Sequence, residues 1–88
     1  MAGADRAVGV APASQAKQQR IDDRARTKEL ARLERLIGRA DEQERELHEQ
    51  LAQNATDHIA VAAIGAQLAE VIARKQDAED AWLQVADE

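Results

Sequence analysis

Two runs of apolar residues, spaced alternately three and four apart, constrain the fold of this chain more than any other feature. The first run consists of Leu30, Leu33, Ile37, Ala40, Leu47 and Leu51, with Glu44 at the one interrupted position. The second consists of Val61, Ile64, Leu68, Val71, Lys75, Ala78, Trp82 and Val85, in which Lys75 is the one charged member. This spacing is typical of the a and d positions of a coiled coil. The sequence therefore predicts two long amphipathic helices.

The segment between the two runs is too short to separate the helices. It reads AQNATDH over residues 52–58, and Asn54, Thr56 and Asp57 are residue types that form turns and begin helices. Such a connection makes the two helices antiparallel neighbours. We therefore predict an all-α fold, a two-helix antiparallel coiled-coil hairpin over residues 15–88, with helix 1 at about 15–53 and helix 2 at about 57–87. Ser14 and Thr56 are the predicted N-caps.

Residues 1–14 have no apolar periodicity. They read MAGADRAVGVAPAS, a stretch of small residues that gives a second element nothing to pack against. We predict a disordered N-terminal tail or linker there.

Folding the chain about Ala55 and Thr56 predicts which seam positions face each other. Leu47 then lies near Ile64 and Ala40 near Val71, while Trp82, the only aromatic residue, closes the open end over Leu30. In this register Glu44 and Lys75 lie about two heptad layers apart and are expected not to form a direct pair.

The sequence carries none of the residue patterns that catalysis or cofactor binding requires. Cysteine is absent, and the four glycines are scattered rather than gathered in a phosphate-binding loop. His48 and His58 flank the turn without a defined third ligand, so surface histidines are the simpler interpretation. The most apolar stretch, residues 59–66, is shorter than the roughly 17–25 residues that cross a bilayer. We expect a cytoplasmic, non-enzymatic, monomeric hairpin that contacts no membrane and holds neither a cofactor nor a metal.

Charge is distributed unevenly between the two halves of the chain. Residues 17–39 contain eight basic and four acidic residues, a balance of +4, whereas residues 40–88 contain three basic and twelve acidic residues, a balance of −9. The cations spaced mostly three or four apart in the first half are Lys17, Arg20, Arg24, Lys28, Arg32, Arg35 and Arg39. They form a basic strip suited to phosphates and without base readout. Two interpretations stay open: the strip binds nucleic acid, or the two halves neutralise each other on a solvated surface.

The order of several short segments resembles a known family. These are the run RTKELARLERLI at residues 26–37, Glu46-Leu47-His48, the ATDH junction at residues 55–58, and Asp80-Ala81-Trp82-Leu83. Together they resemble the C-terminal coiled-coil domain of ABC-F ATPases, the Uup-like proteins, especially the actinobacterial form. The resemblance covers about residues 17–88, while the alanine-rich second helix and the acidic total charge depart from the family pattern.

The resemblance implies an accessory domain of a larger protein that acts on ribosomes and in translation. ATP would be bound by the ATPase domains of that parent chain, which would also be partners of this domain. The implied role is binding of DNA or ribosomal RNA without sequence specificity, carried by the seven residues of the basic strip. The alternative is a purely structural or protein-binding coiled coil, serving as a spacer or a dimerisation element.

Overall fold

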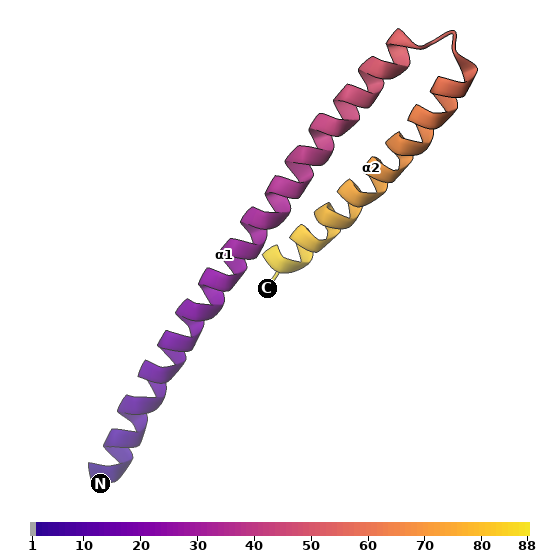
Figure 1. The fold of residues 1–88 in the computed structure, drawn as a ribbon. Helices are drawn as coiled ribbons and strands as arrows, with labels where there is room; N and C mark the ends of the chain where they lie inside the picture. The colour runs from indigo at the N-terminus through magenta and orange to yellow at the C-terminus, as the bar shows by residue number, and fades with distance from the viewer. Residues whose placement is uncertain (1) are drawn as a thin grey trace.

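The computed structural model of the chain contains two helices that run antiparallel along a common rod (Figure 1). Helix α1 spans Ala2–Gln53 and helix α2 spans His58–Ala86, and a turn of residues 54–57 joins them. The structure describes the backbone of residues 2–88 and the side chains of residues 14–88. The rod measures 84 × 14 × 13 Å. The predicted antiparallel helical hairpin is confirmed.

The buried residues occupy the predicted seam positions. Six side chains are buried, three on each helix: Leu33, Ala40, Leu47, Ile64, Val71 and Ala78. Four of them, Ala40, Leu47, Ile64 and Val71, form one cluster, and partly buried apolar residues pack against it. A small side chain from one helix thus shares the cluster with larger ones from the other, which lets the two backbones approach without leaving a void. Apolar burial along a single stripe of each helix is the main force that holds the hairpin together.

The N-cap of α2 is Asp57, whereas we predicted Thr56. Asp57 has an extended backbone with φ −99° and ψ 100°, and its Oδ1 accepts hydrogen bonds from the backbone N–H groups of Ile59 and Ala60, both at 3.1 Å. Thr56 lies one residue too early to reach these donors. On the other side of the turn, the Asn54 side-chain amide donates to the Gln50 carbonyl at 2.8 Å and satisfies one of the free carbonyls that end α1.

Replacing Asp57 with alanine is expected to lower the free energy of unfolding by about 1 kcal/mol, because two N–H groups at the start of α2 lose their acceptor. Urea unfolding followed by circular dichroism at 222 nm measures this loss. Thr56→Ala is the matched control and is expected to change stability by only a few tenths of that amount. A loss in Thr56→Ala that exceeds the loss in Asp57→Ala would place the cap at Thr56 after all.

The N-terminal end of α1 differs from the prediction. The helix begins at Ala2 rather than near Gln15, so Ser14 lies inside it and is not its N-cap. Residues 2–14 contain five alanines, which favour a helix, but also Gly3, Gly9 and Pro12, which disfavour a helix interior. Met1 and the side chains of residues 2–13 lie outside the described part of the chain, so the flexibility of this lead-in stays a prediction.

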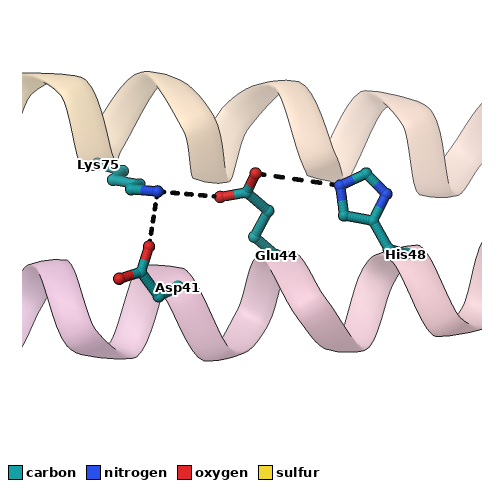
Figure 2. Close-up of polar contacts among 4 residues, drawn as sticks. All are labelled: Asp41, Glu44, His48 and Lys75. Carbon is teal, nitrogen blue, oxygen red and sulfur yellow. Dashed lines mark hydrogen bonds and ion pairs between the residues drawn. The ribbon is translucent and has the colours of Figure 1, made fainter.

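Lys75 pairs directly with Glu44, which contradicts the prediction that the two lie too far apart (Figure 2). The Lys75 Nζ lies 2.6 Å from the Asp41 Oδ1 and 3.4 Å from the Glu44 Oε2. In any α-helix the Cα–Cβ bonds tilt towards the helix N-terminus. In an antiparallel hairpin this tilt makes Glu44 lean towards the open end and Lys75 lean towards the turn. The two side chains therefore converge across a distance that counting backbone positions overestimates.

Lys75 makes the stability of the hairpin depend on pH in the alkaline range. Its hydrogen bond to Asp41, aided by Glu44, raises the pKa of Lys75 above its ordinary value. A raised folded-state pKa means that the stabilisation is present below the unfolded-state pKa and is lost as pH rises through the folded-state pKa. We expect Lys75→Gln to lower stability near neutral pH and to flatten the decline above about pH 10. Thermal melts of both proteins across this range, compared with Arg74→Gln, measure the difference, and parallel curves for Lys75→Gln and the parent would contradict it.

Trp82 uses both its apolar ring and its polar atom. The residue is half-buried at its predicted seam position, and its Nε1–H donates to the Glu34 Oε1 at 3.3 Å. Glu34 lies one helical turn closer to the turn than Leu30, the predicted partner, and the same convergence of side-chain directions accounts for this shift. The indole is therefore part of the contact between the helices and does not stand free on the surface.

Gly38 and Gly65 lie inside the two helices without any steric need for glycine. A Cβ placed on either residue would meet no atom within 4 Å. Alanine at each site is expected to raise the free energy of unfolding by about 0.5–1 kcal/mol, because it restricts the unfolded chain and has a higher helix propensity. Chemical denaturation of the two single variants checks this. A loss of stability in either variant would mean that glycine is needed there.

Candidate nucleic-acid interface

The seven residues of the basic strip all lie exposed on α1. The structure leaves each of them open to solvent, namely Lys17, Arg20, Arg24, Lys28, Arg32, Arg35 and Arg39. Arg26, the eighth cation of this region, is half-buried at a seam position instead. The seven residues extend over about 33 Å of helix at 1.5 Å per residue. The straight helix thus presents a line of cations long enough to meet several phosphates of one polyanion.

The basic strip faces away from α2. At about 100° per residue, its seven members fall within an arc of about 120°, whose centre lies nearly opposite the buried Leu33, Ala40 and Leu47. The four acidic residues of the same region, Asp22, Asp23, Glu29 and Glu34, all fall outside this arc. The outward face of α1 between residues 17 and 39 therefore carries seven cations and no acidic residue, although the exposed Ile21 also lies on it.

Arg32 is the member of the strip that already has an acidic partner. Its Nε donates to the Glu29 Oε2 at 3.0 Å, and a second guanidinium nitrogen contacts the other carboxylate oxygen. This bidentate hydrogen bonding raises the pKa of Arg32 and lowers the pKa of Glu29. Both groups are exposed, so solvent screens the pair and it adds little to stability. Arg32 would contact a phosphate only in competition with Glu29.

The described ion pairs do not support mutual neutralisation of the two halves of the chain. Within residues 14–88, the ion pairs that join α1 to α2 are those of Lys75 with Asp41 and Glu44, and no strip residue pairs with α2. Asp77 of α2 lines a surface groove together with Arg39, at the edge of the strip, but no ion pair joins the two. The cations of the strip other than Arg32 have no ion-pair partner in this part of the chain.

The outward face of α1 changes sign towards the turn. Beyond Arg39 the same arc carries Glu42, Glu46 and Glu49, which are all exposed. A polyanion is therefore attracted to the half of the rod near the open end and repelled from the half near the turn. This polarity restricts where along the rod a nucleic acid can lie.

One feature beside the strip escaped the sequence reasoning. Leu36, which the seam does not require, lines a surface groove together with Arg39 and with Arg74 of α2. The sequence did contain one signal for this groove, because Leu36 is an apolar residue directly before the seam residue Ile37. Its neighbour Arg74 on α2 could not be predicted, since that contact depends on how the two helices are aligned. The groove places an apolar surface next to the edge of the basic strip.

The histidines near the turn do not gather further ligands. His48 Nε2 lies 3.9 Å from the Glu44 Oε1 on its own helix (Figure 2). Among the described side chains, no group of three or more His, Asp or Glu residues is placed to hold a metal ion. Neither α1 nor α2, over the residues described, includes a segment long and apolar enough to cross a membrane.

Comparison with known proteins identified no relative of this chain. No family model matches the chain, and no curated protein or solved structure matches it significantly. The structural class of this protein, a two-helix antiparallel hairpin, is defined by its fold alone. Its resemblance to the C-terminal domain of ABC-F ATPases stays a prediction from the sequence.

Proposed function

We propose that this hairpin is a non-catalytic accessory domain that binds nucleic acid, DNA or ribosomal RNA, without sequence specificity through its basic strip. The observation that carries the proposal is the face of α1 between Lys17 and Arg39, which carries seven exposed cations and no acidic residue and is turned away from α2. Cations on such a face neutralise phosphates and release their counterions, a term that does not depend on base sequence.

Base-specific and single-strand modes of recognition have little support in the described residues. Trp82, the sole aromatic residue, packs half-buried between the helices with its N–H donated to Glu34, so it offers no platform for base stacking. Contact with the phosphates is then the remaining mode of nucleic-acid binding, because contacts to the phosphate backbone fix a protein on a duplex without reading the base sequence.

We further propose that the domain belongs to a cytoplasmic ABC-F ATPase. The sequence resemblance described above is the support for this assignment, and the absence of catalytic patterns in this chain agrees with it. ATP would then be bound by other domains of the parent protein, and this hairpin would help to hold that protein on a ribosome or another nucleic acid.

Fluorescence anisotropy tests the nucleic-acid proposal. The protein is titrated into a labelled duplex DNA of about 20 base pairs and into a labelled RNA hairpin, each at about 50 mM and about 200 mM salt. We expect both ligands to bind, scrambled sequences to bind equally well, and the logarithm of the binding constant to fall by about 0.9 per phosphate contact for each tenfold rise in salt. Absence of binding to both ligands at the lower salt concentration would reject this function and leave the structural or protein-binding role.

A further inference from the structure

Leu36 lines a largely apolar surface groove that also contains two arginines. Its side chain is 38% exposed, although it lies one turn from the buried Leu33. The groove has a volume of about 460 Å³, and its floor is completed by Ala40, Ala78 and Ala81. The charged residues lining it are Arg39, Arg74 and a single carboxylate, Asp77. Arg39 and Arg74 have no ion-pair partner among the described side chains. The groove is thus apolar in its floor and cationic at its rim.

Leu83 has the opposite surroundings. It is 56% exposed on α2, and its neighbours three and four residues away on the helix include Glu79, Asp80 and Asp87. All three acidic residues are exposed. Leu83 is thus an exposed apolar side chain surrounded by three carboxylates, and we call these four residues the Leu83 patch.

The groove and the Leu83 patch cannot meet within one molecule. On α2, Leu83 lies across the seam from Arg74 and Ala81, at about 180° from them at 100° per residue. The residues that line the groove accordingly include neither Leu83 nor its acidic neighbours. The two surfaces therefore lie on opposite sides of the rod.

We propose that the Leu83 patch of one copy of this chain docks into the Leu36 groove of a second copy. Leu83 would enter the apolar floor, and its ring of carboxylates would face Arg39 and Arg74. The complementary charges and the apolar surface on each side are the reason for choosing a second copy as the occupant. The contact buries little area, so it forms at high protein concentration and weakens with salt.

This contact joins unlike surfaces, so it does not close into a symmetric dimer. Each copy keeps a free groove at one side and a free Leu83 patch at the other, and further copies add in the same direction. Copies stacked side by side in this way would all turn their basic strips to one face. A row of hairpins would then present a broad cationic surface, although the association itself requires no nucleic acid.

Sedimentation velocity of the protein without nucleic acid tests the self-association. We expect the mean sedimentation coefficient to rise with concentration at about 50 mM salt, without a plateau at a dimer, and to rise less at about 500 mM salt. A monomer at all concentrations and at both salt levels would overturn the proposal, and a plateau at a closed dimer would overturn the head-to-tail arrangement.

Three single variants locate the contact. Leu36→Gln and Leu83→Gln each remove one of the two surfaces while keeping good helix formers, and both variants are expected to be monomeric. Ile59→Gln is the matched control: Ile59 is 84% exposed but lies outside both surfaces, so this variant is expected to associate like the parent protein. Loss of association in Ile59→Gln alone would place the interface on a different face of α2. Circular dichroism of each variant checks that the helices persist.

Mixing the two monomeric variants gives the sharpest result. Leu36→Gln retains a working Leu83 patch, and Leu83→Gln retains a working groove, so an equimolar mixture contains one intact contact. We expect this mixture to form a one-to-one dimer that does not grow further. A mixture that stays monomeric would show that the two surfaces do not bind each other.

Discussion

Replacing Ile64 with alanine is expected to destabilise the hairpin by about 2–4 kcal/mol. Ile64 is 7% exposed and belongs to the cluster with Leu47 and Val71, so truncation loses buried apolar contacts and leaves a cavity. A chain of this size has a total stability of roughly 4–13 kcal/mol, so this single change removes a large part of it. Each kcal/mol corresponds to a shift of about 4–8 °C in Tm for a domain of this length. Thermal unfolding followed by circular dichroism at 222 nm measures the shift.

Ile59→Ala is the control for this prediction because it makes the same chemical change on the same helix. Its side chain is 84% exposed, and alanine has the higher helix propensity. We expect a change of less than about 0.5 kcal/mol, in either direction. Similar losses of stability in Ile64→Ala and Ile59→Ala would show that Ile59 is buried against another surface. The seam would then not be the only core of the protein.

Removing four cations from the basic strip is expected to abolish measurable nucleic-acid binding. The variant carries Arg24→Gln, Lys28→Gln, Arg35→Gln and Arg39→Gln. If each residue meets one phosphate of a duplex, the slope of log K against log salt falls by about 3.6, and affinity at about 50 mM salt falls at least about a thousandfold. Glutamine keeps the helix propensity, and these exposed positions contribute little to packing. Anisotropy titrations across a series of salt concentrations give both quantities.

A second variant with four substitutions distinguishes the effect of the basic strip on binding from the effect of the net charge of the protein. Glutamate replaces four exposed alanines on the outward face of α2: Ala62, Ala66, Ala69 and Ala73. This variant has the same net charge as the glutamine variant, but its strip is intact. We expect it to bind with a nearly unchanged salt slope. Equal loss of binding in the two variants would mean that net charge, and not the strip, governs the interaction.

Local patterns predicted the helices and the seam well, because they depend on features that are close together in the sequence. Burial follows the spacing of three and four residues, and even the interruptions at Glu44 and Lys75 are half-buried at seam positions. The cap at Asp57 was missed by one residue, since Thr and Asp are both good caps and only the backbone conformation distinguishes them. The start of α1 at Ala2 was not predicted, because residues 2–14 have no apolar periodicity that would mark a helix.

The sequence by itself determined the hairpin, its turn and the outward direction of the basic strip. These features follow from the helical repeat, which places Leu33 and Arg35 on different faces of α1 whatever else the chain does. Only the tertiary structure decided what lies across the seam: the pairing of Lys75 with Asp41 and Glu44, the bond from Trp82 to Glu34, and the groove between Leu36 and Arg74. Those contacts depend on the alignment of two helices and on the opposite tilt of their side chains, and neither of these is encoded in the spacing along one helix.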